Sequence, residues 1–221
     1  MPFIILKIKY FCIMESMNPI ILETMYWILF AIPSILIAST VHEYAHAWVA
    51  TKLGDLTAKA NGRLTLNPLS HIDPIGALSM LIFRFGWSKP VPINEYNFEN
   101  RERDTALVSL AGPASNVILL LFTALINYLL KPTGLFYTFI LTFAIINTVL
   151  AVFNLLPIPP LDGHKIVRAF LPRKIRYYWE ELEKYQLILL VILLIPVFPF
   201  GSIISSIIGH TLPFILNLLG F

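Results

Sequence analysis

The sequence predicts an all-α membrane protein, a polytopic bundle of about five to six transmembrane or half-membrane helices. Two observations predict this class. First, 57% of the 221 residues are hydrophobic and only 13% are charged, whereas about a quarter of the residues in a soluble domain are charged. Second, several uncharged stretches approach the roughly 20 residues that one helical crossing of a bilayer needs. A disulfide-built secreted domain is excluded because Cys12 is the only cysteine.

Residues 1–24 are expected to form a separate N-terminal segment, followed by one domain over residues 25–221. The beginning of the chain holds an apolar run and two lysines, but no signal-peptide cleavage pattern. Met14, Met17 and Met25 all lie shortly before the first long apolar stretch. One hypothesis is therefore that translation begins at one of these methionines.

Four long apolar stretches are predicted to be membrane spans. They are residues 25–50, 105–130 and 134–156, and a fourth stretch that begins near residue 186. After Pro196, Pro199 and Gly201 the apolar run resumes over residues 202–221. The C-terminal region is therefore expected to be either one broken span or two.

A shorter apolar stretch, Ile75 to Phe83, is too short to cross a membrane. Asp73 as N-cap and Pro74 at the first helical position favour a helix start, so a re-entrant or half-buried helix is expected. The prolines within residues 89–94 then favour a short extended or β segment near residues 86–96. The edge of such a segment is a candidate for pairing with an unwound substrate, and a plain surface loop is the alternative.

The basic residues indicate the orientation. Of the 16 lysines and arginines, 13 lie in three segments between apolar stretches, residues 51–73, 84–104 and 164–185. Short loops rich in lysine and arginine stay in the cytoplasm, so a multi-pass cell-membrane protein with these segments in the cytoplasm is expected. The lysines and arginines border the apolar spans and form no continuous basic surface. A lipid bilayer, and not nucleic acid, is therefore the expected partner despite the net charge of +3.

The first span contains the pattern HExxH as His42, Glu43 and His46. Residues i and i+4 share one helix face, so both imidazoles can bind a single zinc ion. Glu43 is turned roughly 100° from His42, where it reaches a metal-bound water better than the metal and can act as general base. The alternative is a pair of hydrogen-bonded core histidines, which is disfavoured because ionisable groups in a membrane helix are costly unless functional.

A catalytic zinc needs a third protein ligand. Of the four aspartates, only Asp162 lies at the end of an apolar stretch. Three prolines shortly before it forbid regular helix, and irregular backbone near membrane depth is tolerated only against protein or a water-filled cavity. A turn at the membrane surface is the alternative for Asp162, but beside the HExxH pattern it is the leading third ligand. His71 and His164 lie in loops with residues that suit turns, and are not expected to bind zinc.

The depth and surroundings of the site follow from its neighbours. His46 lies six residues before Lys52, so the zinc is expected roughly 9 Å below the cytoplasmic interface. Asn154, eight residues before Asp162, is a candidate to bind the oxyanion or a substrate carbonyl, with a helix-end cap as the alternative. Asn116 should face the protein interior, and the small residues around Gly112 favour close helix packing.

Four motifs together resemble the site-2 protease family of intramembrane zinc metalloproteases, in its small bacterial and archaeal form. They are HEYAH at 42–46, GRLTLNPLSHIDPIG at 62–76, AGPASN at 111–116 and NLLPIPPLDG at 154–163. The resemblance implies one Zn²⁺ held by His42, His46 and Asp162, Glu43 as the catalytic base, and the α-helical membrane core of that family. It also favours a catalytic role for Asn154. Some relatives carry a PDZ domain or a CBS pair, and residues 25–221 leave room for neither.

The predicted function is therefore hydrolysis of peptide bonds in a single-span membrane protein, in a transmembrane or membrane-proximal segment. A zinc-dependent scaffold or chaperone that binds transmembrane helices without cutting them is the alternative. Glu43 argues against it, because a binding protein needs no base. A metal transporter would need polar residues along several spans, whereas here they cluster at one depth.

Overall fold

The computed structural model describes residues 18–83, 86–195 and 202–221. Met14 and Met17, two of the possible translation starts, lie outside these residues, and so does most of the predicted segment 1–24. Within the remainder of that segment, Asn18 is the N-cap of the first described helix and residues 19–24 belong to that helix. Apart from one isolated β-bridge, between Ile72 and Ser88, the regular structure in the described part is helical. The prediction of an all-α membrane protein is confirmed.

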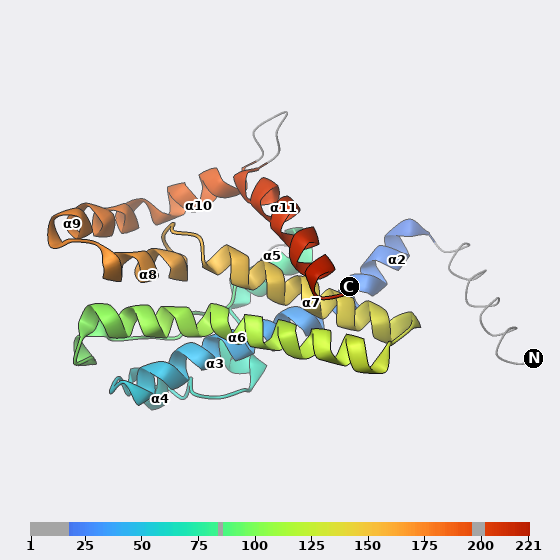
Figure 1. Ribbon diagram of the computed structural model, residues 1–221, viewed down its shortest axis with the longest axis horizontal. Coiled ribbons are helices and arrows are strands. Elements are labelled where there is room, and N and C mark those ends of the chain that lie inside the picture. The colour runs from blue at the N-terminus through green and yellow to red at the C-terminus, as the bar shows by residue number, and fades with distance from the viewer. Residues whose placement is uncertain (1–17, 84–85, 196–201) are drawn as a thin grey trace, which may run out of the picture.

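Three helical units in the described part are long and apolar enough to cross a membrane. The first joins α2 (Pro19–Tyr26), a π-helical turn η1 (Trp27–Ala31) and α3 (Ile32–Lys52), and the others are α6 (Arg101–Leu130) and α7 (Gly134–Asn154). α3, α6 and α7 run roughly alongside one another, and each contacts the other two (Figure 1). These three units correspond to the first three predicted spans.

The interior shared by these three helices combines small residues with polar ones. Ala38, Ala47 and Ala50 on α3 are fully buried, and Gly112 lies on the facing side of α6. Small side chains let membrane helices approach closely. Asn116 on α6 and Asn147 on α7 are also fully buried, so the prediction that Asn116 faces the interior is confirmed.

The C-terminal third consists of short helices, in the region where the sequence left one broken span or two open. It forms α8 (Asp162–Phe170), α9 (Arg173–Glu181), the 3₁₀ turn η4 (Leu182–Tyr185), α10 (Gln186–Leu194) and α11 (Ile203–Leu218). α10 has nine residues and ends two residues before Pro196, because the residue before a proline is pushed out of helical conformation. Figure 1 shows α11 returning at an angle toward α7, which it contacts. The described residues of this region thus make two short helices and not one long span.

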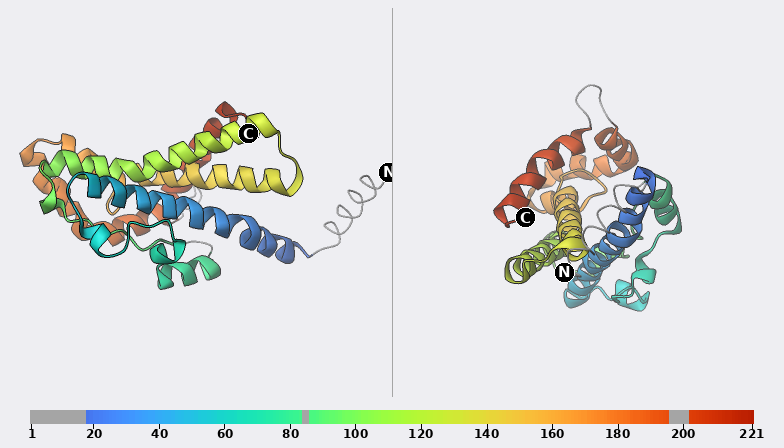
Figure 2. Two further views of the ribbon diagram at one scale, coloured as in Figure 1. Left: turned by 90° about the horizontal axis from the view of Figure 1, so that it is seen from below. Right: turned by 90° about the vertical axis from the view of Figure 1, so that its right-hand side faces the viewer.

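The segment between α3 and α6 carries several short elements. They are α4 (Thr57–Ala60), the 3₁₀ turn η2 (Pro68–His71), α5 (Pro74–Phe83) and the 3₁₀ turn η3 (Glu95–Asn97). α5 is the predicted half-membrane helix, and the Asp73 carboxylate accepts from the Gly76 N–H at 2.8 Å, as an N-cap does. In Figure 2, left, α5 (teal) is set to one side of the long helices. Between α5 and η3, the described residues 86–94 form neither helix nor strand, but Ser88 pairs with Ile72 in the isolated bridge and Asn94 has extended dihedral angles. We refer to residues 86–94 as the extended segment.

Candidate metal centre

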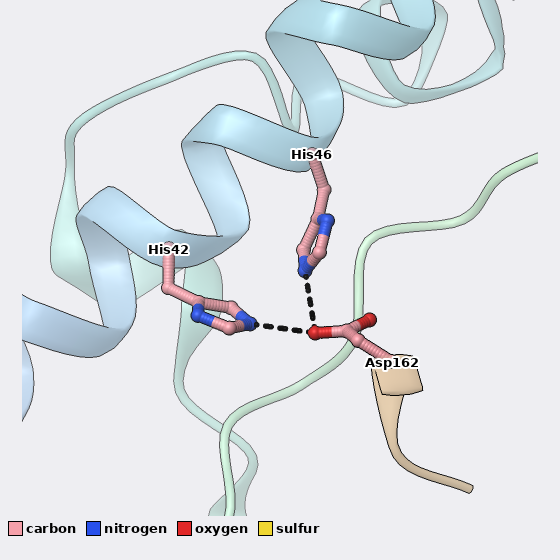
Figure 3. Close-up of side chains that lie close together, drawn as sticks. All are labelled: His42, His46 and Asp162. Atoms are coloured by element: carbon pink, nitrogen blue, oxygen red, sulfur yellow. Dashed lines mark ion pairs between the residues drawn. The ribbon is translucent and has the colours of Figure 1, made fainter. Parts of the chain in front are cut away.

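His42 and His46 on α3 meet Asp162, the first residue of α8, at one point (Figure 3). The Nε2 atoms of the histidines lie 3.2 Å and 3.3 Å from the same oxygen of Asp162, Oδ2. The three ligand atoms lie within 4.8 Å of one another. Both histidines are buried. The structure therefore brings together, across 116 residues of sequence, the three side chains predicted to hold the metal.

The hydrogen bonds of the two imidazoles show that this cluster suits a cation. His46 Nδ1 lies 2.7 Å from the carbonyl oxygen of Val108, and His42 Nδ1 lies 2.7 Å from Oδ1 of Asn116. Each Nδ1 donates, because both partners are acceptors. The neutral rings then present the lone pairs of Nε2 to the carboxylate of Asp162, whose Oδ2 is buried without a hydrogen-bond donor. Three acceptors facing one another require a metal ion or a proton between them.

Asn116 connects His42 to the neighbouring helix. Its Nδ2 donates to the carbonyl of Ala38 at 3.2 Å and to Oδ1 of Asn147 at 3.0 Å. Asn147 Nδ2 in turn donates to the carbonyl of Phe143 at 2.8 Å. Sequence reasoning placed Asn116 inside but missed its bond to His42, and it did not single out Asn147. An amide in an otherwise apolar span is the signal that marks both.

Gly112 leaves the space in which the histidine tips lie. A Cβ atom at this position would collide with Nε2 of both His42 and His46. Because those rings are already fixed through their Nδ1 atoms, they cannot move aside without losing a hydrogen bond. The small residue predicted to aid helix packing is therefore needed by the metal centre itself.

Glu43 is held by the extended segment. Its Oε1 accepts from the hydroxyl of Ser88 and its Oε2 accepts from the backbone N–H of Val91, both at 2.9 Å. The segment is itself tied down, since the Lys89 N–H donates to the carbonyl of His71 at 2.8 Å and Arg63 donates to the carbonyl of Lys89 at 2.6 Å. The carboxylate one residue from His42 therefore has a fixed position, supplied by a part of the chain more than 40 residues later.

The remaining candidates make hydrogen bonds or ring contacts to residues other than the three ligands. Asn154 ends α7, and its Nδ2 donates to the carbonyl of Leu150 at 2.9 Å, so its catalytic role stays a prediction. His71 Nε2 bonds to the carbonyl of Thr65, and His164 stacks on Trp179 with the ring planes 7° apart. Neither histidine belongs to the group of three ligands, in agreement with the sequence prediction.

A buried arginine joins α8 to the neighbouring elements. Arg168, on the same helix as Asp162, contacts Glu95 of η3 at 2.7 Å and Glu102 of α6 at 3.3 Å. Burial favours the neutral form of Arg168, but the ion pair with Glu95 outweighs it and holds the pKa of the guanidinium above its usual value. These ion pairs connect the helix that supplies the third ligand to the far end of the extended segment.

The fold and the site define a class of protein, a helical membrane protein with an HExxH helix and a distant aspartate at one candidate metal centre. Comparison with known proteins gives the family. The model of "Peptidase family M50" matches residues 127–197. The Bacillus subtilis protein "Putative zinc metalloprotease YwhC" is 40% identical over 178 residues, which are 76% of this chain and 80% of YwhC. The chain belongs to peptidase family M50, the site-2 protease family.

More distant relatives agree. "Putative zinc metalloprotease Rip2" of Mycolicibacterium smegmatis is 30% identical over 168 residues, 72% of this chain and 64% of Rip2. "Putative zinc metalloprotease MJ0611" of Methanocaldococcus jannaschii is 32% identical over 127 residues, 58% of this chain and 63% of that protein. No solved structure gave a significant match. The resemblance stated from the four sequence motifs is thereby confirmed.

Proposed function

We propose that this protein is an intramembrane zinc metalloprotease that hydrolyses peptide bonds in single-span membrane proteins. One observation carries the proposal. Two imidazole nitrogens and a carboxylate oxygen converge within 4.8 Å of one another, with the carboxylate of Glu43 on the adjacent position of the same helix. Membership of peptidase family M50 and the names of the relatives support the reaction class.

Zinc is the metal that this donor set favours. Two histidines and one carboxylate are the protein ligands of several catalytic zinc sites, which keep a fourth position open. Magnesium and calcium prefer all-oxygen sites. When bound, zinc supplies a Lewis acid that activates water and polarises a peptide carbonyl.

The protein side chains divide the remaining work. Glu43 takes a proton from the attacking water and returns it to the leaving amine. Its bonds to Ser88 and Val91 keep it from swinging away between these two steps. Asp162 and the two histidines hold the metal, and Asn154 steadies the charge on the oxyanion after a change of rotamer that releases Leu150.

The extended segment is the proposed place of substrate binding. It lies next to the base, because Val91 donates directly to Glu43. Pro90 and Pro92 on either side of Val91 have no N–H, so at these positions the segment offers carbonyl groups only. A substrate strand that pairs here must supply the N–H groups, which a transmembrane helix exposes only after it unwinds.

We also propose that the site opens toward the cytoplasm. One segment rich in lysine and arginine, residues 51–73, begins at the end of α3 nearest to His46, and such segments remain on the cytoplasmic side. The test is Lys52→Cys in a Cys12→Ser background, treated with a membrane-impermeant thiol reagent. Labelling is expected in broken cells only, and labelling in intact cells would overturn the orientation.

The central experiment measures metal content and cleavage on the same detergent-purified samples. Wild type should hold one zinc per chain and cut a single-span reporter. Glu43→Gln should keep the zinc and lose cleavage, Asp162→Ala should lose both, and His210→Gln, at an exposed histidine on α11, should lose neither. Cleavage by Glu43→Gln would contradict the mechanism. Zinc without cleavage of the reporter by wild type would favour the scaffold function instead.

A further inference from the structure

We infer that Asn147, on α7, is a positioning residue that fixes the proton of His42 on Nδ1 and so keeps Nε2 free for the metal. The inference rests on the proposed function in that the metal is taken to be zinc. Asn147 is fully buried, and its described side-chain bonds go to Phe143 and Asn116, not to a metal ligand. It acts on the metal centre through Asn116.

The first step is the orientation of the Asn147 amide. Its Nδ2 donates to the carbonyl oxygen of Phe143, one turn earlier on α7, at 2.8 Å. A backbone carbonyl can only accept. The nitrogen of the amide is therefore committed to the backbone, and Oδ1 is left to face Asn116.

The second step transfers this orientation to Asn116. Asn116 Nδ2 has two hydrogens, and they go to Asn147 Oδ1 at 3.0 Å and to the carbonyl of Ala38 at 3.2 Å. Both partners are acceptors, so the nitrogen of this amide must point away from His42. Oδ1 of Asn116 is then the atom that faces His42 Nδ1 at 2.7 Å.

The third step fixes the imidazole. Because Asn116 offers an acceptor, His42 must donate from Nδ1, and a neutral ring then has its lone pair on Nε2. That lone pair points at Asp162 Oδ2, 3.2 Å away. If the Asn116 amide were reversed, its Nδ2 would face Nδ1 of His42. Its Oδ1 would then face two other oxygens, the carbonyl of Ala38 and Oδ1 of Asn147, with no hydrogen between them. The chain of bonds therefore has one direction, set by the carbonyls of Phe143 and Ala38.

The two histidines differ in this respect. His46 donates directly to a backbone carbonyl, that of Val108, so its tautomer is fixed by the main chain. His42 depends on two side chains, and substitution can therefore uncouple it from the fold. Partners of this kind, which orient a metal-binding histidine, change metal affinity by about 10- to 100-fold when removed.

The test compares zinc affinity, by competition with a chelator, in four full-length proteins. Asn147→Leu removes the acceptor for Asn116 and should weaken zinc binding about 10- to 100-fold. Asn147→Asp should bind like wild type, because burial within the helix bundle favours the neutral form of a carboxyl at this position, which then accepts from Asn116 while donating to Phe143. Thr148→Val is the matched control, since the Thr148 hydroxyl is equally buried but bonds only to Ala144 within α7.

A second readout follows the proton itself. In the zinc-loaded wild type, the buried Nδ1–H of His42 should exchange slowly with solvent and give a distinct ¹H–¹⁵N signal that is absent from His42→Gln. This signal should disappear or exchange faster in Asn147→Leu and persist in Asn147→Asp. If Asn147 only stabilised the fold, Asn147→Leu would lower the thermal unfolding temperature, but the His42 signal would be the same in Asn147→Leu and Asn147→Asp.

Three outcomes would overturn the inference: zinc affinity of Asn147→Leu equal to wild type, an equal loss in Thr148→Val, or failure of the folded Asn147→Asp to restore binding. Absence of zinc from the wild type would overturn the proposed function instead. The two failures are therefore distinguishable in one set of measurements.

Discussion

The backbone N–H of Val91 donates to the carboxylate of Glu43 at 2.9 Å, across 48 residues of sequence. The hydroxyl of Ser88 donates to the other carboxylate oxygen, so each oxygen of Glu43 accepts one hydrogen bond. A carboxylate oxygen can accept more than one hydrogen bond, so Glu43 remains able to receive a proton while it is held. The segment proposed to bind substrate and the group proposed to move the proton are thus joined directly by hydrogen bonds.

The first prediction tests this contact. Ser88→Ala removes one of the two bonds to Glu43 and should reduce cleavage about 10- to 150-fold, since a hydrogen bond to a charged group contributes about 1.5–3 kcal/mol. Zinc content should not change, because Ser88 does not touch the ligands. The control is Ser39→Ala, whose hydroxyl bonds within α3. Unchanged cleavage by Ser88→Ala would show that Val91 alone positions the base.

The second prediction concerns the space at Gly112. Gly112→Ala should abolish zinc binding, because the added methyl group collides with Nε2 of His42 and His46. Metal analysis of the purified protein is the measurement. Gly209→Ala is the matched control on α11, where a Cβ meets nothing within 4 Å and alanine favours the helix by up to about 1 kcal/mol. Full zinc occupancy in Gly112→Ala would contradict the described packing.

The third prediction is a pH dependence at Asp55. Burial would raise the pKa of its carboxyl, but hydrogen bonds from Thr57, Asn94 and Asn97 outweigh burial and hold the pKa below its usual value. The folded state therefore binds this proton less well than the unfolded state. The resulting stability is present above the unfolded pKa of about 3.9 and is lost as the pH falls through the folded value.

The measurement is thermal unfolding in detergent between neutral and acidic pH. Asp55→Asn should unfold at a lower temperature than wild type at pH 7, and the difference should shrink below about pH 4. A difference that stays constant over this range would show that the charge of Asp55 does not contribute.

The fourth prediction concerns the ion pairs of Arg168. Arg168→Ala leaves the carboxylates of Glu95 and Glu102 without their buried partner. Arg101 and Arg176 still pair with these carboxylates, so the free energy of unfolding should fall by about 1.5–3 kcal/mol, the range for a hydrogen bond to a charged group. Zinc binding should also weaken, because α8 carries Asp162. Denaturant unfolding and metal analysis check the two effects. Lys165→Ala, on the same helix, should change both much less, and equal effects from the two variants would contradict the role of Arg168.

The parts of the structure predicted from sequence are those set by short-range patterns. The spacing of His42 and His46 places them on one helix face, and the spans of α3, α6 and α7 follow from the length of their apolar stretches. Asp73 and Pro74 predicted the start of α5. Asp162 was reached by elimination among four aspartates, which works because so few ionisable groups lie near the apolar stretches.

The parts that sequence reasoning missed depend on long-range contacts. The bond of Asn116 to His42 joins two helices 74 residues apart, and no local pattern tells which neighbour a buried amide will meet. The contact between Ser88 and Glu43 is likewise set by tertiary packing. At the C-terminus, by contrast, the helix end at Leu194 follows from a local signal, the proline at position 196.

The position of Asp162 in the chain has a consequence for biosynthesis. A ribosome that has inserted α3 has made both histidines and the base, but the third ligand arrives only after α6, α7 and the proline-rich turn have followed. Until α8 docks, a nascent chain has two of the three ligands and no acidic group beside their Nε2 atoms. Under the proposed function, an unfinished copy would therefore stay inactive until α8 supplies Asp162.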